Sequence, residues 1–230
     1  MIRECLEGDS GLTFRLAHED EKLKADSLAL RLSLSSKRYD LIDEAAYRRH
    51  YSNPDMSMFV IAVDASQEIR ACMRLDTPYD LRQYTTFTVP VSLPPRVVGD
   101  IGVYLDRASV SPVAVLRDLW AFACRISDYS ELTHLYGQVQ ERYVRGWVRL
   151  GCEVVTSRFS VQGWRGRWLG LLLDLGQMRR SPCDPALKMQ WSSRYGCRLH
   201  VEFWRRVEEL LGDPKRWHLP GSGGQPALRE

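Results

Sequence analysis

The sequence predicts a mixed α/β (α+β) fold, in which a mostly antiparallel central sheet is flanked by helices and followed by a C-terminal helical extension. Three patterns indicate this fold. Two β-prone runs, 58–63 and 69–75, flank a polar loop and predict an antiparallel hairpin. Apolar residues over 113–126 repeat with the period of an amphipathic helix. A second amphipathic helix follows residue 200 and ends at Gly212.

The remaining elements follow in chain order. Acidic residues at 19–21 suit the start of a helix over about 20–38, although the leucines of 28–34 also alternate with the period of a strand. The other predicted elements are strand 12–17, helix 43–51, irregular segment 77–95, strand 97–110, strand 132–139, helix 141–150, and strands 154–161 and 167–175. Strands and helices in this order predict a sheet covered on both faces. We expect one domain over 1–176, a helical extension over 177–219 packed on it, and a disordered tail over 220–230.

Composition narrows the class of protein. The 230 residues are 44% hydrophobic and 27% charged, enough for one sizeable core, and the net charge of +3 does not predict nucleic-acid binding. Arginine outnumbers lysine 27 to 5, which favours recognition of carboxylates or phosphates. The six cysteines form no metal-ligand spacing, so we expect reduced thiols and no metal. With no apolar run long enough to cross a membrane and no signal-peptide core, we expect a soluble cytoplasmic protein without integral membrane association.

A motif near the middle of the chain indicates an activity. The stretch LYGQVQERYVRGWVRLGCEVV (135–155) contains an aromatic-x-x-Leu-Gly step at 147–151. It resembles the closing β-α-β unit of the GNAT superfamily, and the predicted element order is similar to that of the same superfamily. The resemblance implies transfer of an acyl group from a thioester to an amine by direct attack, without a covalent enzyme intermediate.

Three further segments point to one branch of that superfamily. Acetyl-CoA-dependent members hold the pyrophosphate on a glycine-rich loop, whereas residues 111–116 read SPVAVL without glycine. ACMRLDTPYDL (71–81) and DRASVSP (106–112) are similar to motifs of the N-acyl amino acid synthases and autoinducer (acyl-homoserine lactone) synthases. This resemblance covers roughly 12–175. It implies a fatty acyl donor on acyl carrier protein and an amino acid or related small amine as acceptor.

Two departures from the branch leave alternatives open. Tyr104 stands where the branch usually has a glutamate, and Ser35 where it has an aromatic residue. The alternatives are an acetyl-CoA-dependent acetyltransferase with a degenerate loop and a catalytically inactive GNAT-fold binding protein. In either enzyme reading we expect acyl carrier protein thioester or acyl-CoA as a cosubstrate and no bound cofactor.

Acyl transfer needs a group that accepts the proton of the amine, directly or through water. The candidates are Asp100 and Asp106 on the predicted long strand, Tyr104 between them, and His134 on the next strand. Each acid has the alternative of an ion pair or a solvated strand end, and a single histidine in a strand is more often a core residue.

Arginines are the candidates for the polar end of the acceptor. Arg74 and Arg107 lie beside the predicted pocket, and each has the alternative of a buried pair with an aspartate, which for Arg74 is equally weighted. The resemblance adds Arg31, Ser109 and Val110 to the substrate site. The large aromatics fit a core as well as an acyl tunnel built through it, namely Trp120, Phe122, Trp147, Trp164 and Trp168.

A basic stripe is predicted on the helix that follows strand 132–139. Arg142, Arg145 and Arg149 are three and four residues apart and share one face, while Val144 and Val148 point elsewhere. We expect this stripe to dock an acidic acyl carrier protein, with an ordinary solvated helix face as the alternative.

Overall fold

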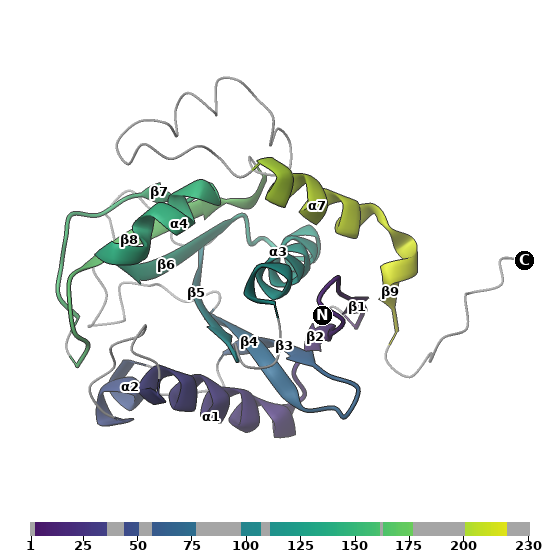
Figure 1. Cartoon of the computed structure of the whole chain (residues 1–230), viewed down its shortest axis with the longest axis horizontal. Coiled ribbons are helices and arrows are strands. Elements are labelled where there is room, and N and C mark those ends of the chain that lie inside the picture. The colour runs from purple at the N-terminus through teal and green to yellow at the C-terminus, as the bar shows by residue number, and fades with distance from the viewer. Residues whose placement is uncertain are drawn as a thin grey trace, which may run out of the picture.

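The computed structural model describes residues 3–35, 44–50, 57–76, 98–106, 111–161, 163–176 and 201–219. Within these ranges the strands form one nine-stranded sheet with helices on both faces (Figure 1). The strands are β1 Cys5–Glu7, β2 Thr13–Leu16, β3 Met58–Val63, β4 Ile69–Asp76, β5 Val98–Leu105, β6 His134–Gln140, β7 Glu153–Val154, β8 Trp168–Asp174 and β9 Trp217–His218. The helices are α1 Glu19–Ser35, α2 Glu44–His50, α3 Pro112–Tyr129, α4 Val144–Arg149 and α7 Val201–Gly212, with 3-10 turns η3 Glu141–Tyr143 and η4 Pro214–Arg216.

The strand order is β7-β8-β6-β5-β4-β3-β2-β1-β9, and every neighbouring pair is antiparallel except β5 and β6. These two strands are parallel because the helical crossover α3 connects them. Their pairing covers only Val98 with His134, Gly99 with Leu135 and Asp100 with Tyr136. Both strands continue beyond that point, to Leu105 and Gln140, without further pairing between them. The sheet is therefore split at its centre.

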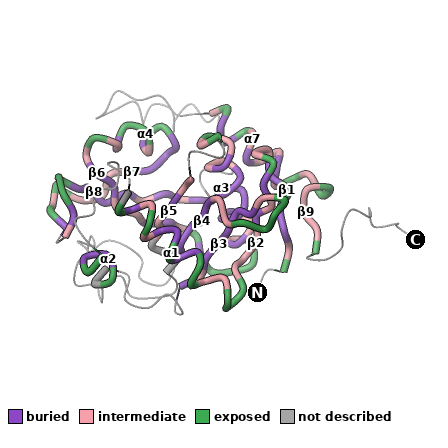
Figure 2. Tube along the Cα trace, turned by 60° about the horizontal axis from the view of Figure 1, so that its bottom comes forward, coloured by how far each residue is buried: buried purple, intermediate pink, exposed green. Residues whose placement is uncertain are grey.

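Two hydrophobic clusters fill the layers on either side of the sheet. One contains the inner faces of α3, α4 and α7, and the other contains residues of α1 and α2 together with the segment 159–168. Figure 2 shows the buried residues following the central strands and the inner side of α3. In the described ranges, no helix combines the length and apolar character that crossing a membrane requires.

The C-terminal segment packs into the core. Trp204 of α7 is fully buried, its Nε1 donates to the Leu150 carbonyl at 2.8 Å, and its ring lies 6.4 Å from that of Trp120 on α3. β9 then adds a strand beside β1. Asp9, in the turn between β1 and β2, binds arginines of α3, α7 and η4, at 3.2 Å from Arg117, 2.8 Å from Arg206 and 3.3 Å from Arg216. Charge-assisted bonds thus hold the first turn and the last helix together.

The predicted fold class is confirmed, as are the hairpin β3–β4, the helices α3 and α7, and the strands β6 and β8. The leucine-rich segment is the helix α1, because Ala25, Leu28 and Ala29 lie three and four apart on its buried face. The predicted strand 97–110 is shorter, ending at Leu105, and 107–110 lie outside the described residues. The tail and the irregular segment 77–95 also lie outside them.

The predicted strand 154–161 is wrong. Only Glu153–Val154 is a strand, followed by an isolated bridge from Phe159 to Trp168. Thr156 explains the break, because its hydroxyl oxygen accepts the Gly170 N–H at 2.7 Å, where a strand would offer a backbone carbonyl. The short strands β1 and β9 were not predicted, since runs of two or three residues give too little periodicity.

Candidate active site

The candidate site lies where β5 and β6 stop pairing. A cavity of about 150 Å³ occupies the split, between the ends of the two strands. Its wall includes members of both hydrophobic clusters, so the cavity passes from one face of the sheet to the other. Cavities at such a break in a sheet are common ligand sites, because the diverging strands leave backbone and side chains uncovered.

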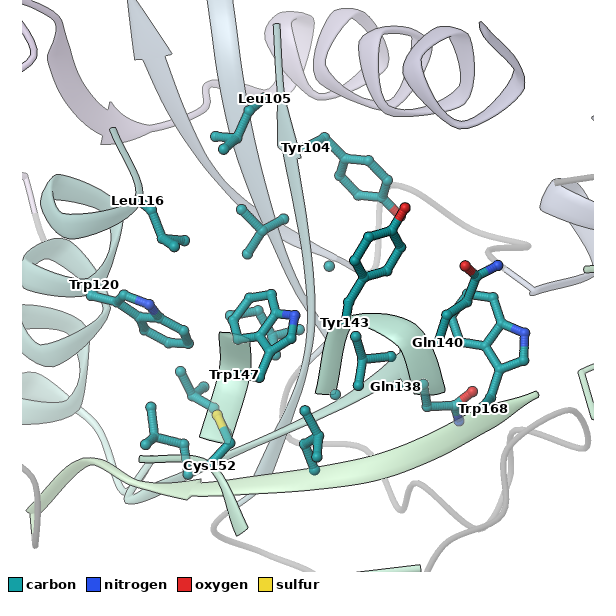
Figure 3. Close-up of a pocket in the computed structure, with 18 of the residues that line it drawn as sticks. Tyr104, Leu105, Leu116, Trp120, Gln138, Gln140, Tyr143, Trp147, Cys152 and Trp168 are labelled. Carbon is teal, nitrogen blue, oxygen red and sulfur yellow. The ribbon is translucent and has the colours of Figure 1, made fainter. Parts of the chain in front are cut away.

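The face toward α3 and α4 is apolar. Alternate strand residues point to it, and helix residues close it, namely Ile101, Val103, Leu105, Leu135, Val139, Leu116, Trp120, Trp147, Cys152, Leu171 and Leu173. Figure 3 shows Trp120 and Trp147 on this side, and their rings meet edge to face at 6.2 Å. This part of the site suits an aliphatic chain.

The opposite face carries polar groups. Tyr104, Gln138 and Gln140 come from the intervening strand positions, and Tyr143 of η3 joins them. In Figure 3 the Tyr104 and Tyr143 rings point toward one another. Gly102 is required beside Tyr104, because a Cβ at residue 102 would lie 2.9 Å from the tyrosine ring. Among the described residues that line the cavity, none is an aspartate, glutamate, histidine, lysine or arginine.

Trp120 and Gln138 bring buried hydrogen-bond donors to the wall. The indole Nε1 of Trp120 and the amide Nε2 of Gln138 are buried, and neither has a hydrogen-bond partner in the described part of the chain. A buried donor without a partner costs about 1–3 kcal/mol. A ligand that brought carbonyl oxygens to these donors would recover that free energy.

Cys152 is not suited to act as a nucleophile. Its thiol lines the cavity, and burial raises its pKa to about 12, so it stays protonated at neutral pH. The arrangement therefore favours direct reaction between two bound substrates over a covalent enzyme intermediate.

A buried polar cluster lies under the polar face, between α1, α2 and β4. Asp26 accepts hydrogen bonds from Tyr47 at 2.9 Å, Arg48 at 2.5 Å and Arg74 at 3.1 Å. Burial raises the pKa of Tyr47, and Tyr104 also contributes to the increase, so Tyr104 is close to this cluster. Arg74 thus forms the buried pair with an aspartate that was one of its two predicted alternatives.

The structure brings only some of the predicted residues to the cavity. Tyr104 lines it. Asp106 follows β5, with its N–H donating to the Arg70 carbonyl at 3.0 Å, and is not in the cavity wall. His134 lies at the paired end of β6, where Nε2 is 3.7 Å from a carboxylate oxygen of Asp174.

Of the other predicted residues, Asp100 is the last one of β5 to pair with β6. Arg31 is exposed on the outer side of α1, away from the cavity. Arg107, Ser109 and Val110 lie outside the described residues. Among the predicted tunnel aromatics, the four tryptophans line the cavity, whereas Phe122 packs on Trp217 in the core.

The exposure of the basic stripe agrees with the pattern predicted from the sequence. Arg142, Arg145 and Arg149 are exposed, whereas Val144 and Val148 are buried. The guanidinium of Arg142 lies 4.9 Å from the centre of the Tyr143 ring, which is part of the cavity wall. The stripe therefore begins next to the candidate site.

Sequence reasoning missed Gln138, Gln140 and Tyr143. A signal was present, because β6 alternates Leu135, Gly137 and Val139 with polar side chains although both of its faces are covered. A polar residue at every second position of a central strand indicates a lined cavity rather than a dry core.

The split mixed sheet with helices on both faces has the architecture of the GNAT fold. No protein-family model matches the chain, and no curated protein matches its sequence. Among solved structures, FeeM, an N-acyl amino acid synthase from uncultured soil microbes, is similar in fold, with 11% identity and a TM-score of 0.53 over 72% of this chain and 92% of that one.

Two further solved structures align with lower scores. The AHL synthase LasI aligns at 14% identity and a TM-score of 0.49, over 72% of this chain and 91% of that one. A GCN5-related N-acetyltransferase from Brucella melitensis aligns at 14% identity and a TM-score of 0.48, over 90% of this chain and 96% of that one. The similarity to FeeM confirms the predicted fold.

Proposed function

We propose that the protein is an N-acyltransferase that moves a fatty acyl group from an acyl carrier protein thioester to the amine of an amino acid or a related small molecule. The observation that carries the proposal is the cavity at the split, which is apolar toward α3 and α4 and polar on the other face. The apolar face suits a long-chain acyl donor, and the polar face suits a polar acceptor. The split between the faces is where the thioester carbon and the amine would meet.

The apolar lining favours a fatty acyl group over an acetyl group. From the split, the wall continues past Trp120 and Trp147 to Cys152 and to Leu171 and Leu173 of β8. An acetyl group has one methyl to bury, whereas each further methylene gains about 0.8 kcal/mol on burial. A long chain therefore gains most from this wall.

The start of α3 also supports a donor without the nucleotide part of coenzyme A. Pro112 occupies the first helical position and has no N–H, and Ser111 provides no side-chain cap. Helix N-termini bind phosphate through free backbone N–H groups. Loss of one such group weakens the site that acetyl-CoA would need, and a phosphopantetheine thioester does not need it.

The chemistry we propose is direct attack. The neutral amine forms a bond to the thioester carbon, the C–S bond breaks, the nitrogen loses one proton and the leaving sulfur gains one. Tyr104 is the group we assign to this transfer, giving its hydroxyl proton to the sulfur and receiving the proton of the amine, directly or through water. Positioning of the two substrates supplies most of the rate.

Carrier-protein docking is assigned to Arg142, Arg145 and Arg149. Their exposure and their position next to Tyr143 fit an acidic partner that delivers its thioester into the split. Because that partner is cytoplasmic, we expect the enzyme to act in the cytoplasm.

The test is acyl transfer by the purified chain, with a set of amino acids and four donors. Three carry the same long-chain acyl group on acyl carrier protein, coenzyme A or pantetheine, and the fourth is acetyl-CoA. We expect acylated amines to form fastest from acyl carrier protein. Mass spectrometry of organic extracts from an overexpressing bacterium identifies the acceptor. Turnover of acetyl-CoA equal to that of the long-chain donors would support the acetyltransferase alternative, and no product from any donor would support the inactive binding protein.

A further inference from the structure

The loop between Trp164 and Trp168 carries two arginines that the reaction above does not use. Arg165 and Arg167 are exposed, whereas the two tryptophans on either side are buried and line the cavity. The loop therefore lies where the cavity wall meets the surface. In the part of the chain that the structure describes, neither guanidinium forms an ion pair or a side-chain hydrogen bond.

The backbone of this loop is fixed by the cavity wall. The Arg165 carbonyl accepts hydrogen bonds from Gln140 Nε2 at 3.0 Å and from Trp168 Nε1 at 3.2 Å, and the Arg167 carbonyl accepts from the Glu141 N–H at 2.9 Å. Gly166, with a φ of 85°, permits the tight turn between the two arginines. Their positions at the rim are thus set by residues of the site itself.

The loop stands on the acceptor side of the sheet. Trp164 and Trp168 belong to the same hydrophobic cluster as Tyr104, on the α1 face, whereas the wall assigned to the acyl chain belongs to the other cluster. The described lining contains no cation to bind an anionic acceptor group inside the cavity. Arg165 directly follows Trp164 and Arg167 directly precedes Trp168, so both arginines adjoin this side of the wall, whereas Arg142 beside Tyr143 belongs to the basic stripe.

We propose that Arg165 and Arg167 bind the carboxylate of the acceptor, which makes the acceptor an α-amino acid rather than a simple amine. Guanidinium binds carboxylate with two parallel hydrogen bonds, so it fixes the direction of the substrate as well as its charge. With the carboxylate at the rim, the amine and side chain extend inward past Gln140 toward Tyr104. This inference rests on the proposed acyl transfer and specifies its acceptor.

The experiment compares matched acceptors with and without the carboxylate, L-tyrosine against tyramine and L-phenylalanine against phenethylamine, with one long-chain pantetheine thioester as donor. For Arg165→Ala and Arg167→Ala we expect kcat/KM for the amino acids to fall about 10- to 100-fold, as for loss of a charge-assisted bond. The kcat/KM for the amines should change by less than about threefold. Arg165→Lys should recover part of the loss. Arg158→Ala is the matched control, because Arg158 is also exposed in this segment but is paired with Glu141.

Three results would overturn the assignment. Wild-type turnover of both acceptor types without preference for the carboxylate would refute the carboxylate site and leave the acyltransferase function standing. Equal losses for amino acid and amine in the variants would mean that the loop supports the fold of the site, which thermal unfolding would also reveal. The same assays are repeated with this acyl group on acyl carrier protein, and losses seen only with that donor would place the two arginines in carrier docking. Absence of turnover with every acceptor would refute the proposed function itself.

Discussion

Replacing Arg74 with methionine separates its structural role from a role in acceptor binding. The side chain is 3% exposed, its guanidinium donates to Asp26 at 3.1 Å, and it lies 5.5 Å from the centre of the Phe59 ring. Removing one partner of a buried ion pair costs about 3–5 kcal/mol. Because Asp26 keeps its bonds to Tyr47 and Arg48, we expect the lower end, about 3 kcal/mol.

For a chain of this size, a loss of about 3 kcal/mol lowers the Tm by roughly 6–12 °C. Scanning calorimetry measures it, and steady-state kinetics on the folded variant at low temperature measure the KM for the acceptor, which should stay near the wild-type value. Arg70→Met is the matched control on the same strand, since Arg70 pairs with Asp64 and Glu68 at the surface and should change the Tm little. A stable Arg74→Met variant with a raised acceptor KM would refute the structural reading.

Three further predictions test the site, the docking face and an ion pair. Tyr104→Phe should lower kcat about 100-fold with little change in KM, and unchanged kcat would remove Tyr104 from proton transfer. Charge reversal at Arg145 and Arg149 should raise the KM for acyl carrier protein strongly but not that for a pantetheine thioester, and salt should mimic it; equal loss with both donors contradicts docking. Glu21→Gln should cost about 3 kcal/mol at pH 7, because hydrogen bonds from Arg15 lower the pKa of Glu21 from 4.5 to about 2. That stability is complete above pH 4.5 and lost as the pH falls through 2, so urea midpoints of variant and wild type should converge there, and a constant gap would contradict the assignment.

The sequence was sufficient to predict the elements that have a long, regular pattern of apolar residues. The hairpin β3–β4 and the helix α3 follow from local periodicity, because each buries one face over many residues. The split between β5 and β6 does not follow from local periodicity. It depends on where two strands joined by a helical crossover stop pairing, and no local pattern encodes that register.

The site was predictable only in part, because most of its residues come from segments that are distant in the sequence. Tyr104 was identified by its place on the strand, but its neighbours come from β6, η3 and the loop before β8. The two alternatives for Arg74 were equally weighted because its partner, Asp26, is 48 residues away on α1. Long-range pairs of this kind are decided by packing, which a single sequence does not display.

The contact between Trp120 and Trp204 connects the apolar face of the cavity to the C-terminal helix α7. Trp120 lines the cavity on one side and packs at 6.4 Å from Trp204 on the other, and Trp204 itself does not line the cavity. A smaller residue at position 204 would let the Trp120 ring move back and would lengthen the space for substrate without any change in a lining residue. Under the proposed function, selection or engineering could therefore change the preferred length of the acyl chain through α7, a helix whose Trp204 does not line the cavity.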